Sequence, residues 1–136
     1  MLFRALLFGL FALPLRAEVV QVPPGADTPP ADGQGKAVVD GDHKGTVLLV
    51  TADDVTLRGL TVQGSGARDE EIDSGIKVIK GVARTVVEDN ILTDNMHGVD
   101  FHGAVDAIAR RNVITGRQDH HMIARGNGFY VWNAPG

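Results

Sequence analysis

Hydrophobic and polar residues alternate in short runs along the chain, and each run is bounded by Gly, Asn or Asp. One set of runs begins with glycine, and the leading glycines lie 30, 23 and 30 residues apart. These runs are Gly45–Val50, Gly75–Lys80, Gly98–Gly103 and Gly128–Asn133. A period of two predicts β-strands and excludes amphipathic helices for these segments.

A second set of runs repeats the order apolar, charged, charged, Asn, apolar, apolar. It occurs at Val87–Leu92 and again at Ala109–Ile114, so that Asn90 and Asn112 lie 22 residues apart. An earlier copy at Leu57–Val62 has Leu at the Asn position. Self-similarity at a period of 20 to 50 residues is typical of solenoid proteins.

The two sets of runs alternate along the chain, and this excludes a simple hairpin meander, in which strands only a few residues apart would pair. Stacking each run on the next copy of itself pairs the strands in parallel. We therefore predict an all-β fold, a parallel β-helix of about three to four coils that spans residues 37–136 and is incomplete at its C-terminus.

The predicted register assigns the faces of the glycine-led strands. Two rows should stack inward: Ile76 with Val99 and Phe129, and Val78 with Phe101 and Val131. Lys77, Asp100 and Tyr130 should face outward, as should Ile79, His102 and Trp132. Opposite charges at Lys77 and Asp100 on neighbouring rungs favour this register.

The repeated asparagines fall in an interior row of the second set of strands. A buried amide must satisfy both donors and its acceptor away from water. We expect Asn90 and Asn112 to form a structural ladder by pairing with each other and with turn backbone, whereas the charges beside them should be ordinary surface charges.

The first 36 residues do not share these repeats. Residues 1–17 are typical of a secretory signal peptide, with Arg4, an apolar run and Leu15-Arg16-Ala17 as the cleavage site. The apolar run is shorter than the roughly 20 residues that a membrane span needs. Residues 18–36 are rich in Pro and Gly and predict an irregular lead-in. An exported, periplasmic protein is therefore expected.

Composition narrows the classes of function. The chain has 136 residues, enough for one domain, with 17 glycines and no cysteine, so neither a disulfide framework nor a thiolate metal site is expected. Its net charge of −4, with both signs interspersed, argues against nucleic acid as a partner.

Three segments resemble the NosD family of periplasmic maturation proteins for nitrous oxide reductase. They are Val39–Val47, Asp53–Val62 and Arg125–Ala134, the last of which contains Phe-Tyr-Val-Trp-Asn. The resemblance covers about Val38–Gly136, the front part of a longer protein. It implies a right-handed parallel β-helix of the carbohydrate-binding and sugar-hydrolase type. It also implies a non-enzymatic role in assembling the copper sulfide site of the reductase, with an ABC transporter membrane subunit and a copper chaperone as partners.

Copper is the cofactor that this resemblance suggests, and the chain offers two clusters of imidazole and thioether ligands, which suit Cu(I). The candidate metal ligands are His120, His121, Met122, Met96 and His97. Their spacing fixes no coordination geometry, so the alternative interpretation is that both clusters are polar loop residues between strands.

The outward row Ile79, His102 and Trp132 is a candidate surface for a partner protein or a sugar ring. Alternatively, the segment from Gly64 to Ser74 covers this face. The rival function is a β-helical protein that binds or cleaves carbohydrate, for which Asp100 with His102, and Asp94 or Asp119, are the available acids. A non-functional fragment is a third interpretation.

Overall fold

The computed structural model describes residues 37–119, 121 and 125–136, and these form a parallel β-helix. The predicted signal peptide and lead-in lie outside the described residues. The strands are β1 Ala37–Asp40, β2 Leu48–Val50, β3 Thr56–Arg58, β4 Leu60–Gln63, β5 Ser74–Val78, β6 Val86–Glu88, β7 Ile91–Asn95, β8 His97–His102, β9 Ile108–Arg110, β10 Val113–Gly116 and β11 Phe129–Trp132. Every strand pair is parallel, which confirms the predicted fold class.

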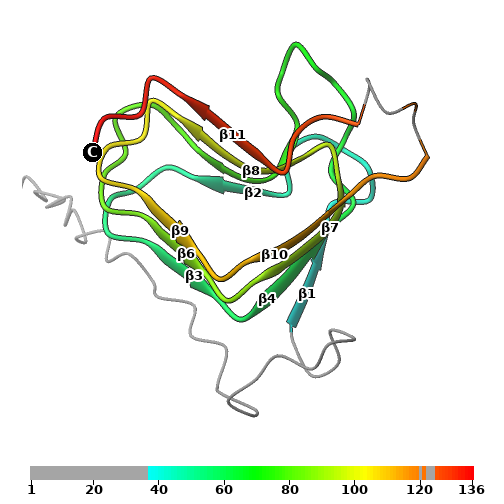
Figure 1. The fold of residues 1–136 in the computed structure, drawn as a ribbon, viewed down its shortest axis with the longest axis horizontal. Helices are drawn as coiled ribbons and strands as arrows, with labels where there is room; N and C mark the ends of the chain where they lie inside the picture. Colours follow the sequence, from blue (N-terminus) through cyan, green and yellow to red (C-terminus); the bar gives the residue numbers. More distant parts are fainter. Residues whose placement is uncertain (1–36, 120, 122–124) are drawn as a thin grey trace, which may run out of the picture.

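The strands form three sheets that enclose the core like the sides of a triangle (Figure 1). Their orders are β1-β4-β7-β10, β2-β5-β8-β11 and β3-β6-β9. The two predicted sets of strands thus give three sheets, because each Asn-type run divides at one residue with positive φ. These residues are Gly59 at 73°, Asp89 at 55° and Arg111 at 53°. A left-handed residue turns the chain abruptly, so the residues on either side join different sheets.

The glycine-led strands have the predicted register. Ile76 pairs with Val99 and Val99 with Phe129, and the pairing of Lys77 with Asp100 places Lys77 Nζ 3.5 Å from the Asp100 carboxylate. The core centres on the buried side chains of the middle coils. Phe129 and Val131 follow the inward rows, yet they are 45% and 60% exposed, because none of the described residues lies over the last coil. With Phe101 they line an open hollow of about 310 Å³.

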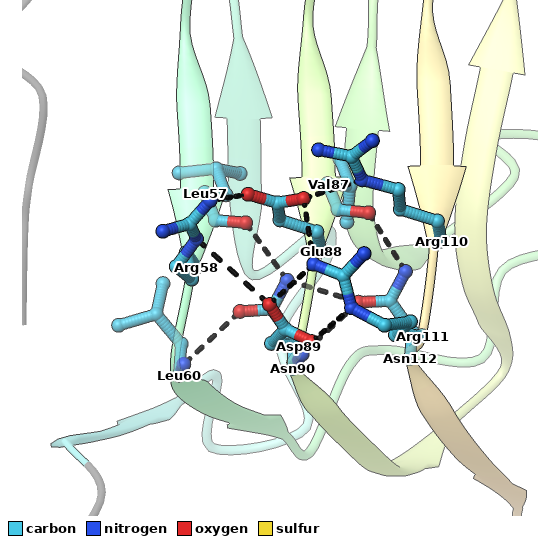
Figure 2. Close-up of polar contacts among 10 residues, drawn as sticks. All are labelled: Leu57, Arg58, Leu60, Val87, Glu88, Asp89, Asn90, Arg110, Arg111 and Asn112. Carbon is cyan, nitrogen blue, oxygen red and sulfur yellow. Dashed lines mark hydrogen bonds and ion pairs between the residues drawn. The ribbon is translucent and has the colours of Figure 1, made fainter. Parts of the chain in front are cut away.

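Asn90 and Asn112 form a ladder of hydrogen bonds, which Figure 2 shows. The Asn90 amide donates to Leu57 O at 2.9 Å and accepts from Leu60 N at 3.0 Å. Asn112 Oδ1 accepts from both nitrogens of Asn90 at 3.1 Å, and Asn112 Nδ2 donates to Val87 O at 2.8 Å. Each side-chain amide therefore satisfies backbone groups that the turns leave unpaired.

A third amide, Asn95, does the same at the next corner, although it lies outside the repeated Asn-type pattern. Asn95 Oδ1 accepts from Ser65 N at 3.1 Å, and its Nδ2 donates to Val62 O at 2.9 Å. These bonds join β7 to the end of β4 and fix the start of the loop that follows. That loop, residues 64–73, projects from the solenoid next to the first residues of β8 (Figure 1).

Candidate functional site

The outer face of the β5-β8-β11 sheet carries a buried cluster of ionisable side chains. At its centre is Asp100 on β8, whose side chain is 0% exposed. Neither carboxylate oxygen accepts a hydrogen bond from the described residues, and the ion pair with Lys77 is the main compensation. Burial raises the pKa of Asp100, whereas the positive charges of Lys77 and of protonated His102 and His97 act in the opposite direction. The outward position was predicted, but exposure to solvent was not found.

Lys77 connects Asp100 with the loop of residues 64–73. Its ammonium group donates to Glu71 O at 2.7 Å while it faces the Asp100 carboxylate. The loop is closed by Asp73, which accepts from the backbone and guanidinium of Arg68 at 2.9 to 3.1 Å. Burial would raise the pKa of Asp73, but the bonds from Arg68 outweigh burial and hold it below its ordinary value. The loop of residues 64–73 therefore reaches the Lys77 side of this face, whereas Trp132 of the predicted row remains exposed.

A second segment holds the same loop from the other side. Arg117 follows β10 and is buried, and its Nη1 donates to Ser65 O at 3.1 Å and Gly66 O at 3.2 Å. Its Nε and Nη2 form a two-point ion pair with Asp119. Arg117 therefore fixes the loop of residues 64–73 to the strand end from which the predicted copper-binding segment starts.

Three aromatic rings lie next to Asp100. Tyr130 of β11 meets His97 edge to face, with centroids 5.4 Å apart, and stacks on His102 at 6.3 Å. His102 is half-buried, and its Nδ1 has no hydrogen-bond partner among the described residues. The cluster combines a carboxyl group of raised pKa with imidazoles, a pattern found often at functional sites. Such groups can exchange a proton or accept hydrogen bonds from a ligand.

The predicted row of Ile79, His102 and Trp132 forms only in part. His102 and Trp132 pair in register across β8 and β11, and Trp132 is 61% exposed. Ile79 lies beyond the end of β5 and packs against the hydrophobic core. The surface available to a partner therefore centres on Trp132.

The candidate metal ligands fall in different environments. Met96 is buried between β7 and β8, and the backbone of Gly126 lies against it. Asn127 N donates to His97 Nδ1 at 3.2 Å, so the segment after residue 124 returns to the Met96-His97 pair. A neutral imidazole that accepts at Nδ1 carries its proton on Nε2, which leaves no lone pair for a metal in this arrangement. Burial, the largest effect, lowers the pKa of His97 and favours this neutral form.

His121 is exposed, whereas His120 and Met122 lie outside the described residues. Within the described part of the chain, no group of three or more His, Asp or Glu side chains is arranged to hold a metal ion. The structure thus brings His97 and His102 together around Asp100 on β8, but it joins neither of them to His121.

Sequence reasoning did not place Tyr130, Lys77 or Arg117 in a site. A charged residue in the middle of the otherwise apolar run Val99–Phe101 was the available indication for Asp100. No comparable pattern marks Arg117, because its partners Ser65 and Gly66 are backbone carbonyls more than fifty residues earlier in the chain.

Comparison with known proteins bears out the expected resemblance. The chain is similar to NosD proteins. It is 29% identical over 96 residues to a probable ABC transporter binding protein NosD of Pseudomonas aeruginosa, a match that covers 71% of this chain and 22% of that protein. The protein of the same name from Stutzerimonas stutzeri is 27% identical over 100 residues, covering 74% of this chain and 23% of the relative.

The matched part of the chain spans less than a quarter of the length of each of these relatives. No family model matches the chain, and no solved structure gives a significant match. In the residues that the structure describes, no helix is long and apolar enough to cross a membrane.

Proposed function

We propose that this chain is an accessory part of a transporter-dependent maturation system, acting in the periplasm in the assembly of the copper sulfide site of nitrous oxide reductase. The observation that carries the proposal is its similarity to two proteins named as ABC transporter binding proteins NosD. The parallel β-helix agrees with a binding role, because a stacked solenoid presents long rigid faces to partners. The partners are the membrane subunit of the transporter, a copper chaperone and the reductase itself.

Copper binding in this system is assigned to the segment that leaves β10 and returns to β8. His120, His121 and Met122 supply imidazole and thioether groups that suit Cu(I), and Met96 adds a thioether at the point of return. The anchoring of Gly126 and Asn127 against Met96 and His97 supports this assignment. His97 takes a positioning role, since its Nδ1 holds the backbone of Asn127.

The accessory role is tested in the native host by deleting the gene that encodes this chain. The reductase should still be exported, but it should consume no nitrous oxide and contain less copper and less acid-labile sulfide than the reductase of the parent strain. Reintroducing the intact gene should restore all three quantities. A reductase with full copper and sulfide content in the deletion strain would refute the accessory role.

Copper ligation is tested separately by titrating the purified chain with Cu(I) against a chelating competitor. The combined variant His120→Ala, His121→Ala and Met122→Ala should lose most of its Cu(I) affinity. His43→Ala is the matched control, because this exposed imidazole lies 3.7 Å from Asp94 at another corner of the solenoid. Equal affinity in all three proteins would remove the copper assignment while leaving the accessory role standing.

One observation favours the rival class, a β-helical carbohydrate-binding or carbohydrate-cleaving protein. Trp132 is exposed next to His102, and an exposed indole is a suitable platform for a sugar ring. Cleavage by paired carboxylates is less well supported, because the charged groups that act on Asp100 are Lys77 and two histidines. Binding to a panel of polysaccharides that is lost in Trp132→Ala would favour this class.

A further inference from the structure

The outer face of the β3-β6-β9 sheet carries a carboxylate enclosed by arginines (Figure 2). Glu88, in the middle strand of the sheet, is only 1% exposed although its side chain points away from the core. One of its oxygens accepts from Arg58 Nη2, and the other accepts from Arg110 Nε at 2.5 Å and Arg111 Nη2 at 3.0 Å. We call the three cations, Arg58, Arg110 and Arg111, the arginine row.

The arginine row has more hydrogen-bond donors than its carboxylates use. Each guanidinium group has five N–H bonds. Arg110 donates to Glu88 only through Nε, and within the described part of the chain neither of its terminal nitrogens has an acceptor. In Figure 2 no dashed line reaches either of these two nitrogens. The side chain of Arg110 is 52% exposed and that of Arg58 is 58% exposed, so solvent or a partner can reach the unused donors.

The row also keeps an excess of positive charge. Three guanidinium groups face the two carboxylates of Glu88 and Asp89, which leaves one uncompensated positive charge in a chain of net charge −4. Beside the row, Val86 pairs in register with Ile108, whose side chain is exposed. The face therefore combines unused guanidinium donors with an apolar strip.

We propose that the arginine row is a docking surface for an acidic segment of a partner protein. Glu88 shows how a carboxylate is held here, by guanidinium groups from neighbouring strands. A bidentate contact with the free end of Arg110 would repeat that geometry with a carboxylate of the partner. This surface lies on a different sheet from the Asp100 cluster and does not depend on the proposed role in copper assembly.

Charge complementarity favours a protein segment over an extended polyanion. The row is short, running from Arg58 on β3 to Arg110 on β9, and the Asp89 carboxylate lies within it, 2.7 Å from Arg111 Nε. This carboxylate and the net charge of −4 of the chain would repel an anionic lipid surface or a nucleic acid, which presents charge over a wide area. A single acidic side chain flanked by apolar residues can reach the exposed end of Arg110 and the exposed Ile108 on the same strand.

The test is fluorescence anisotropy with the full chain and a labelled peptide of alternating Glu and Val, at low and at high ionic strength. A peptide of alternating Lys and Val is the control probe. The acidic peptide should bind at low ionic strength, and Arg110→Gln should weaken its binding about fivefold, the loss of one exposed charge-assisted contact. Arg110→Lys, which keeps the charge but not the planar fork, should fall between Arg110→Gln and the parent chain.

Arg84→Gln is the matched control, because it removes the same charge from an arginine whose hydrogen bonds all go to Asp53 and Asp54. Its effect should be less than about twofold. Circular dichroism and unfolding midpoints establish that the variants are folded. The proposal is overturned if the acidic peptide does not bind, if Arg84→Gln weakens binding as much as Arg110→Gln, or if vesicles of anionic lipid bind better than the peptide through Arg110.

Discussion

Two buried carboxylates of this solenoid differ in the hydrogen bonds that compensate their burial. Glu88 accepts hydrogen bonds from three arginines, so its burial is fully compensated. Asp100 is just as inaccessible but has only the ion pair with Lys77 and no hydrogen bond from the described residues. A buried charge without hydrogen bonds costs stability. Glu88 therefore serves the scaffold, whereas Asp100 has the character of a residue kept for a function at the expense of stability.

Replacing Asp100 by Asn tests this distinction. The variant Asp100→Asn should raise the free energy of unfolding at neutral pH by about 1 kcal/mol, because it removes a buried charge that accepts no hydrogen bond and whose ion pair with Lys77 does not offset burial, while Lys77 keeps its bond to Glu71 O. A carboxyl whose pKa is raised in the folded state binds a proton more tightly when folded, so it destabilises the protein as the pH rises through that pKa. The gain in the free energy of unfolding should vanish below pH 3.8, the ordinary pKa of an aspartate side chain. Urea unfolding at several pH values measures both effects.

Asp73→Asn is the control, because it should change the free energy of unfolding in the opposite direction. The pKa of Asp73 is lowered in the fold, against the effect of burial, by hydrogen bonds from Arg68. Its contribution to stability is present above pH 3.8, the ordinary pKa, and is lost as the pH falls through the lowered pKa. This variant should therefore be less stable at neutral pH and approach the parent chain in acid. Parallel pH profiles for the two variants would contradict the assignment of Asp100.

At the scale of the strands, the period-two runs predicted the glycine-led strands and their register, because both follow from local pattern. The division of the Asn-type runs into two sheets was not predictable. It depends on single residues with positive φ. Glycine commonly adopts this conformation, so Gly59 is a recognisable turning point, whereas the residue types of Asp89 and Arg111 do not predict it. The enclosure of Glu88 was missed for a related reason: its arginines come from coils 30 and 22 residues away, and alternation alone places Glu88 on the outside.

The first residues of β8 show how closely the strands pack at a corner. A Cβ atom added to Gly98 would lie 2.5 Å from Gly128 O and 2.6 Å from the Ile114 side chain. Gly98→Ala should therefore lower the free energy of unfolding by about 1–3 kcal/mol, the usual effect of overpacking. Gly116→Ala is the control, because its Cβ would meet no atom within 4 Å and its φ is not positive. Chemical denaturation of both variants should separate them, and an equal loss would show that space at the corner does not set the effect.

At the scale of the whole molecule, the candidate site was only partly accessible to sequence reasoning. Asp100 and His102 were singled out together in one hypothesis and His97 in another, and the strand β8 unites all three with Lys77 and Tyr130 on the neighbouring rungs. Strand pairing between rungs links residues 21 to 30 positions apart, so the order of the repeats predicts the stacking. Side chains that reach across loops, such as Arg117 to Ser65, have no such regularity.

The solenoid also predicts how stability is distributed. Each coil contacts only its neighbours, so a strand paired on both sides should open less often than one paired on a single side. In the described structure β6 pairs with both β3 and β9, and β8 with both β5 and β11. Hydrogen exchange followed by mass spectrometry should find the amides of β6 and β8 about tenfold or more slower to exchange than those of β3, β9 and β11. Comparing β6 with β3 and β9 is the internal control, since all three belong to one sheet and differ mainly in the number of paired neighbours. Uniform protection across the sheet would mean that the chain unfolds as a single cooperative unit instead of opening from its end coils.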